Sequence, residues 1–116
     1  MSVHVYGLPG CTTVRKARKW LDAEGIAHDF TAFEAADDLA ADLDRWIERA
    51  GLDTVLNTRA TTFKALPEAD RETLPQDRAA AIAAMQADPR LIKRPVLEAG
   101  DTVLTGFREA DWRAAL

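Results

Sequence analysis

The chain has 116 residues, of which 47% are hydrophobic and 29% are charged, and its formal net charge is −4. This length and composition are typical of one soluble globular domain, and the acidic balance argues against a nucleic-acid-binding surface, which needs concentrated positive charge. No apolar run approaches the ~20 residues that span a bilayer, and residues 1–10 lack the basic and apolar segments of a secretory signal. We therefore expect a cytoplasmic protein that binds neither nucleic acid nor membrane.

The N-terminal third of the chain predicts a strand–helix–strand unit. Residues 3–6 are a short β-prone run that ends at Gly7, and residues 8–10 have the proline and glycine of a turn. From residue 12 or 13, apolar residues recur at helical spacing until Gly25, and residues 26–33 then predict a second strand. The apolar face of the expected helix consists of Val14, Ala17, Trp20 and Leu21.

The middle of the chain predicts only helices and loops. The expected helices cover residues 39–50, 52–56 and 76–87. In the last of them, Ile82 and Met85 are spaced to share an apolar face. The polar residues 57–62 predict a loop or a helix start, and residues 63–66 predict a further short turn before Pro67.

The C-terminal part predicts a β-hairpin followed by a helix. Residues 96–98 and 102–105 are β-prone and flank an Ala-Gly-Asp turn, and residues 109–116 are compatible with a closing helix. The element order is thus β-α-β, a helical block, then β-β-α, which indicates an α/β fold. We expect a single domain over residues 1–116 with a helical subdomain at about residues 36–90.

Cys11 is the only cysteine of the chain and lies where the first strand gives way to the first helix. A thiolate there is stabilised by the free N–H groups and the positive dipole end of the helix, and the thiolate is the nucleophile. Thr12 and Thr13 are expected to cap the helix or donate hydroxyl hydrogen bonds to the sulfur, and Arg15 to add positive charge. The competing interpretation is a small, inert cysteine in the core.

A lone cysteine limits the chemistry that is available. The position of a second cysteine in a C-x-x-C motif holds Val14, so dithiol exchange within the motif is impossible. The options are monothiol exchange with glutathione or another protein, or nucleophilic attack on an oxyanion.

Arg59, Arg94 and Pro95 are the distant candidates for this site. Isolated arginines are usually solvated, but guanidinium groups that converge on Cys11 would lower its pKa and bind a carboxylate or oxyanion bidentately. Pro95 follows Arg94 at the start of a predicted strand, where proline is tolerated. Because only about 5–6% of X–Pro bonds are cis, the residues alone do not predict a cis bond here. His4 and His28 fall on predicted strands and are expected to be structural, and no metal-ligand cluster is visible in the sequence.

Four blocks of sequence resemble the ArsC/Spx superfamily, and most closely its YffB-like branch. They are residues 5–13 with 15–21, residues 56–62, residues 91–97, and the Gly106–Phe107 pair. The resemblance implies a thioredoxin-like (glutaredoxin-like) fold with a helical insertion between an N-terminal βαβ unit and a C-terminal ββα unit. It also implies that Cys11 is the active-site thiol, that Arg59 and Arg94 approach it, and that Pro95 is a cis-proline.

The activity that this resemblance implies is that of a glutathione-dependent thiol oxidoreductase. Cys11, Arg59 and Arg94 would be the catalytic residues, and Thr12, Thr13, Arg94 and Pro95 would contact the substrate or glutathione. Glutathione would be a co-substrate, and no cofactor or metal would be bound. The expected partners are glutaredoxin and a small-molecule or protein disulfide, and the expected state is a monomer.

Two other branches of the superfamily supply alternative functions. Arsenate reductases of this type use a cysteine and three arginines, of which Arg59 and Arg94 match two. Where that branch has leucine-x-arginine-proline, this chain has residues 104–107, Leu-Thr-Gly-Phe, with Arg108 following, and the missing charge weakens oxyanion binding. The Spx regulators bind RNA polymerase without catalysis, and many carry a C-x-x-C switch that this chain lacks.

Overall fold

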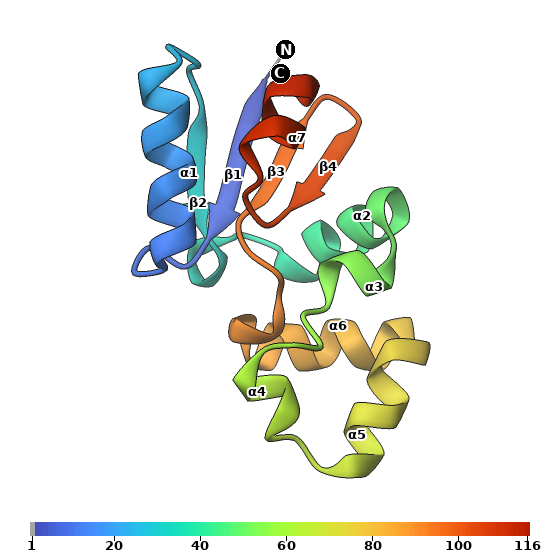
Figure 1. Ribbon diagram of the computed structural model, residues 1–116. Helices are drawn as coiled ribbons and strands as arrows, with labels where there is room; N and C mark the ends of the chain where they lie inside the picture. The colour runs from blue at the N-terminus through green and yellow to red at the C-terminus, as the bar shows by residue number, and fades with distance from the viewer. Residues whose placement is uncertain (1) are drawn as a thin grey trace. The chain divides into compact units, whose positions relative to one another are not determined.

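The computed structural model describes residues 2–116, which form two compact units (Figure 1). The first unit, here the thiol unit, consists of the chain up to Ala36 together with Arg94–Leu116. The second, here the helical unit, is Asp37–Lys93. The prediction of a single domain with a helical subdomain stays a prediction.

The thiol unit is built on a four-stranded sheet with the order β2-β1-β3-β4. β1 (Val3–Gly7) pairs in parallel with β2 (Asp29–Ala32), and α1 (Thr12–Ala23) connects them (Figure 1). β3 (Val96–Ala99) pairs antiparallel with β1 and continues through a tight turn into β4 (Thr102–Thr105).

A single cluster of buried side chains joins α1 and the C-terminal helix α7 (Glu109–Ala115) to one face of this sheet. Its fully buried members are Val5 from β1, Ala17 and Leu21 from α1, Leu97 from β3, and Trp112 from α7. The alternation of a strand predicts this arrangement, because Val5 lies beside Leu97 in the register and their side chains point to the same face.

The helical unit contains short helices joined by tight turns. They are α2 (Leu39–Ala50), α3 (Leu52–Val55), α4 (Thr61–Lys64), α5 (Glu68–Thr73), η2 (Leu74–Gln76), α6 (Arg78–Ala87) and η3 (Pro89–Leu91). The Asp38 and Asp77 carboxylates cap α2 and α6 by accepting backbone N–H groups at 3.1 and 3.0 Å. An isolated antiparallel bridge pairs Leu56 with Ile92 inside this unit.

The second strand is shorter than the sequence predicts. It covers Asp29–Ala32 instead of residues 26–33, so His28 precedes the strand. Ile26 is not part of the strand because it takes part in the C-terminal cap of α1. Its N–H donates to the Leu21 carbonyl at 2.9 Å, and the N–H of Gly25, which has a φ of 70°, donates to the Asp22 carbonyl. Phe33 leaves the sheet to begin the short helix η1 (Phe33–Ala35).

Two helices of the helical unit differ from their prediction. α5 is absent from the prediction because none of its residues is buried, so it has no apolar periodicity. α6 begins at Arg78 and not at residue 76, because Asp77 occupies the capping position. Its buried residues are Ala81 and Met85, whereas Ile82 is half-buried.

Candidate functional site

A tight turn places Cys11 immediately before α1, at its N-cap position. The Cys11 N–H donates to the Leu8 carbonyl at 3.0 Å, which closes the turn through Pro9 and Gly10. The Cys11 carbonyl then accepts the N–H of Arg15 at 3.0 Å, the first hydrogen bond of the helix. Cys11 has an extended backbone, with φ −73° and ψ 127°, and is the N-cap residue of α1. Its side chain therefore lies beside the free amides of the first turn.

The sulfur of Cys11 is half-buried and surrounded by donors. Burial raises the pKa of the thiol, but this effect is outweighed by the Val14 N–H, the Arg94 side chain, the Thr13 N–H and the positive charge of Arg94. The net result is a pKa below the ordinary value of a cysteine thiol. Because the thiolate is the reactive form, this environment favours a nucleophilic cysteine over an inert one.

The threonine hydroxyls do not have the predicted capping role. α1 has no side-chain cap hydrogen bond of ordinary geometry, and the Thr12 and Thr13 side chains are exposed. Thr13 acts on the sulfur through its backbone N–H instead. The capping prediction is therefore wrong, and contact of these two side chains with glutathione stays a prediction.

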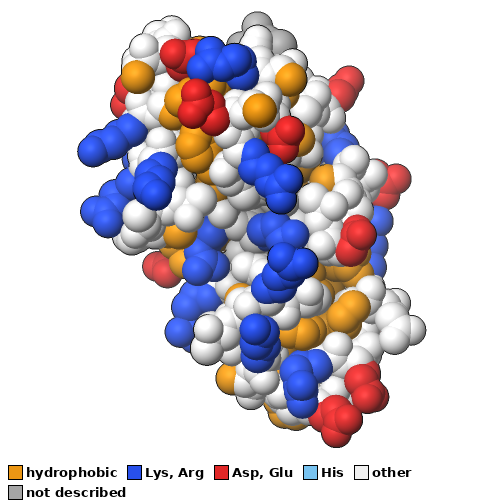
Figure 2. All heavy atoms as spheres, viewed as in Figure 1, with side chains coloured by type: hydrophobic (Ala, Val, Ile, Leu, Met, Phe, Trp, Pro, Cys, Tyr) orange, Lys and Arg blue, Asp and Glu red, His pale blue; other side chains and the backbone are white. Residues whose placement is uncertain are grey.

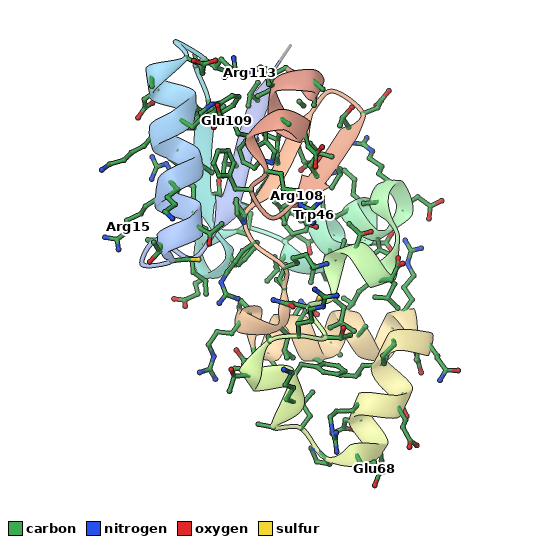
Figure 3. The ribbon with its side chains drawn as sticks, viewed as in Figure 1. Arg15, Trp46, Glu68, Arg108, Glu109 and Arg113 are labelled. Atoms are coloured by element: carbon green, nitrogen blue, oxygen red, sulfur yellow. The ribbon has the colours of Figure 1, made fainter. Side chains whose placement is uncertain are left out.

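Arg15 also departs from its predicted role. Its side chain is exposed and extends away from the start of α1 (Figure 3). It is not among the groups that shift the pKa of Cys11. Its charge belongs to a broader basic surface of α1, to which Lys16, Arg18 and Lys19 contribute (Figure 2).

Arg94 reaches Cys11 because of the strand pairing. Tyr6 in β1 is paired with Val96 in β3, so the residues just after β1 and just before β3 lie close together. Arg94 is half-buried and its side chain hydrogen-bonds the Cys11 sulfur. The peptide bond between Arg94 and Pro95 is cis, as the family resemblance implies.

Hydrogen bonds from the C-terminal residues of the thiol unit fix the chain around Pro95. The Gly106 N–H donates to the Pro95 carbonyl at 2.9 Å, which extends the pairing of β3 with β4 by one step. The Gly106 carbonyl accepts the indole N–H of Trp112 at 3.0 Å. Gly106, where this chain departs from the arsenate reductase pattern, is therefore a structural neighbour of Pro95.

Arg59 lies in the helical unit, in the turn between α3 and α4. Its side chain is exposed, and its N–H donates to the Asn57 side-chain oxygen at 3.2 Å. Asn57 also accepts the Ala60 N–H through its carbonyl at 3.2 Å, so the turn is locally well defined. The approach of Arg59 to Cys11 stays a prediction.

The sequence predicts that the free amides at the start of α1 stabilise the thiolate, but it does not single out Val14 among them. Val14 is expected there only as an apolar residue and as the replacement of a second cysteine. Its N–H, however, makes the largest single contribution that lowers the pKa of Cys11, while Arg94 contributes both through a hydrogen bond and through its charge. The signal was available in principle, because the side chain of an N-cap residue usually faces the amides two and three positions later.

The two histidines are engaged away from Cys11. His4 shares a hydrogen bond of 2.7 Å with the Thr31 hydroxyl and stacks on Tyr6 at 4.1 Å. The His28 ring nitrogen Nδ1 donates to the Ile26 carbonyl at 3.1 Å. Within residues 2–116, no group of three acidic, histidine or cysteine side chains could hold a metal ion, and no helix is long and apolar enough to cross a membrane.

A family model described as the ArsC family matches residues 6–115. The chain belongs to the ArsC family. Among solved structures, the YFFB (PA3664) protein is 43% identical, with a TM-score of 0.88 and 99% of each chain covered. An arsenate reductase (ArsC) related protein from Brucella melitensis is 38% identical, with a TM-score of 0.79 over 98% of this chain and 93% of its own. These similarities confirm the predicted α/β, thioredoxin-like fold.

Curated relatives of this ArsC-family chain include two kinds of protein. An uncharacterized protein from Haemophilus influenzae is 34% identical over 97% of both chains. The global transcriptional regulator Spx from Listeria innocua is 30% identical over 98% of this chain and 86% of its own. The family therefore contains proteins related to arsenate reductases as well as regulators.

Proposed function

We propose that this protein is a thiol oxidoreductase that uses Cys11 in exchange with glutathione. The observation that carries the proposal is the lowered pKa of Cys11, whose sulfur faces the first amides of α1 and the Arg94 side chain. A sulfur with these partners is a better nucleophile at neutral pH than a free cysteine. Cys11 is only half-buried, which is compatible with attack on a substrate.

The reaction takes place in two exchange steps. The Cys11 thiolate attacks the glutathione sulfur of a mixed disulfide, a bond between Cys11 and glutathione forms, and the substrate leaves as a thiolate that takes a proton from water. A second glutathione thiolate then attacks the Cys11–glutathione disulfide. This step releases oxidised glutathione and restores Cys11, so the two electrons that reduce the substrate come from glutathione.

Each predicted site residue has a distinct task in this reaction. Arg94 keeps Cys11 ionised and offers a guanidinium to a glutathione carboxylate, and Arg59 supplies a second one. Thr12, Thr13 and Pro95 form the surface on which glutathione lies. The basic residues of α1 favour an anionic substrate in an otherwise acidic protein. No cofactor is needed, glutaredoxin is a candidate partner, and the protein acts as a cytoplasmic monomer.

The decisive experiment compares the protein with its Cys11→Ser variant. Reduction of a small glutathione mixed disulfide is followed through NADPH oxidation, with glutathione and glutathione reductase present. We expect activity above the protein-free rate for the native protein and none for Cys11→Ser, because serine cannot form the mixed disulfide. Equal rates for the two proteins would contradict the proposal.

Arsenate reduction at the same site is a second candidate, supported by the similarity to the Brucella protein. It is weaker because Gly106 stands where the third arginine of that reaction is expected, and Phe107 where the following proline is expected. Arsenate-dependent NADPH oxidation in the presence of glutathione and glutaredoxin, no higher than with Cys11→Ser, would eliminate it.

A non-catalytic regulator like Spx is the third candidate, supported by the Listeria relative. It predicts stable capture of RNA polymerase that does not depend on Cys11. Failure to retain purified RNA polymerase on the immobilised protein would eliminate it.

A further inference from the structure

The last residue of β1 lies against the first turn of α1 without space for a side chain. Gly7 is buried, and a Cβ atom built on it would lie 2.7 Å from Cγ2 and 3.3 Å from Cγ1 of Val14. Cβ contacts below 3.0 Å are essentially never found in proteins. Any side chain at position 7 would therefore force Val14 to move.

Val14 cannot move by rotating its side chain alone. It is fully buried, with 0% exposure, and a β-branched residue in a helix has one strongly preferred χ1 rotamer. Side chains in protein cores are closely packed, so a fully buried residue has little room to rotate. Relief of the contact would come from a shift of the helix backbone, which carries the Val14 N–H.

That N–H is one of the groups directed at the Cys11 sulfur. Val14 is the third residue of α1, and Cys11 is its N-cap, so both ends of the interaction belong to the same turn. A displacement of a few tenths of an ångström weakens a hydrogen bond to sulfur without unfolding the helix. Gly7 thus controls the distance and direction of a donor that it does not itself provide.

We propose that Gly7 is a positioning residue for the thiol: its missing side chain allows Val14 to pack against β1, with its backbone N–H directed at the Cys11 sulfur. The inference rests on the proposed function only in taking Cys11 as the reactive group. It goes beyond that function by assigning a role in the site to a backbone position four residues away from the cysteine.

The test measures the pKa of Cys11 from thiolate absorbance and from the rate of iodoacetamide alkylation against pH. In Gly7→Ala we expect the pKa to rise towards the ordinary value of about 8.5, with alkylation at neutral pH about three- to tenfold slower. Adding Val14→Ala to Gly7→Ala removes both Cγ atoms and should restore the native pKa.

Gly10→Ala is the matched control in the same loop. A Cβ on Gly10 has no neighbour within 4 Å, and its φ is not positive, so this variant should keep the native pKa. An unchanged pKa in folded Gly7→Ala, or a raised pKa in the double variant, would overturn the proposal. If Gly7→Ala does not fold, the double variant decides, because it must fold and have the native pKa.

Mixed-disulfide reduction is measured on the same variants. A native protein without this activity would contradict the proposed function, while the comparison of pKa values would still test the role of Gly7. The two proposals can therefore fail separately.

Discussion

Arg94 is the only side chain among the groups that lower the pKa of Cys11. Burial acts in the opposite direction, and the other two favourable partners are the backbone amides of Val14 and Thr13. Substitutions other than proline leave the amides of a helix start in place, whereas the guanidinium can be removed by changing the side chain. Arg94 contributes both a hydrogen bond and a charge. Its removal should therefore raise the pKa of Cys11 without altering the structure of α1.

We expect Arg94→Gln to raise the pKa of Cys11 while leaving it below that of a free cysteine. Glutamine can still donate a hydrogen bond but carries no charge, and the amides of α1 remain. The alkylation rate should reach its half-maximum at a higher pH than in the native protein. Arg15→Gln removes an exposed arginine from the same helix start and should not shift the dependence of the alkylation rate on pH. An equal shift in both variants would indicate a general effect of positive charge instead.

At the scale of elements, the sequence predicts those features of a helix that depend on residues close together in the chain. The start of α1 follows from the Pro9–Gly10 turn and from apolar spacing, and its end follows from Gly25. The threonine capping failed because Cys11 itself occupies the N-cap. The meeting of Arg94 with Cys11 depends on pairing between β1 and β3, which no local pattern encodes, and only the family resemblance indicated it.

The packing of α7 provides a prediction with an internal control. Trp112 and Trp20 both contact Phe107, with ring centroids 5.0 and 5.8 Å away. Trp112 is 1% exposed and its indole N–H donates to Gly106, which in turn donates to Pro95. The buried indole N–H of Trp20 has no hydrogen-bond partner within the described part of the chain. The two tryptophans thus differ in this hydrogen bond and in burial, because Trp20 is only half-buried.

Trp112→Phe should lower the free energy of unfolding by about 1–3 kcal/mol, through the lost hydrogen bond and the smaller ring. Trp20→Phe should cost less, because it removes a buried donor that is unsatisfied in the folded state. Urea unfolding, followed by circular dichroism, measures both. A greater loss in Trp20→Phe would show that ring packing, and not the link from Trp112 to Gly106, dominates the stability of this region.

At the scale of the whole molecule, the thiol unit is assembled from the two ends of the chain. Cys11 comes from the first segment and Arg94 from the second, with the 57 residues of Asp37–Lys93 between them. The contact of Arg94 with the Cys11 sulfur therefore exists only when both segments are folded together. Ionisation of Cys11 is for this reason coupled to the folding of the unit.

The sign of this coupling follows from the direction of the pKa shift. The pKa of Cys11 is lowered in the folded state, whereas in the unfolded chain it is about 8.5. Below the folded pKa the thiol is protonated in both states and contributes no stability through ionisation. Between the two values the folded state holds fewer protons, so stability rises with pH, and above the unfolded value the contribution is complete.

Cys11→Ser should therefore lose stability relative to the native protein at alkaline pH and not at acidic pH. Urea unfolding gives the free energy of unfolding of both proteins at about pH 6 and about pH 9.5. These two pH values lie on either side of the pKa of Cys11 in the unfolded chain. Other titrating groups cancel because the two chains differ at one atom. In Arg94→Gln the pKa of Cys11 should be closer to its value in the unfolded chain. The free energy of unfolding of this variant should therefore rise less between about pH 6 and about pH 9.5 than that of the native protein. A difference between native and Cys11→Ser that does not depend on pH would mean that the folded environment does not favour the thiolate.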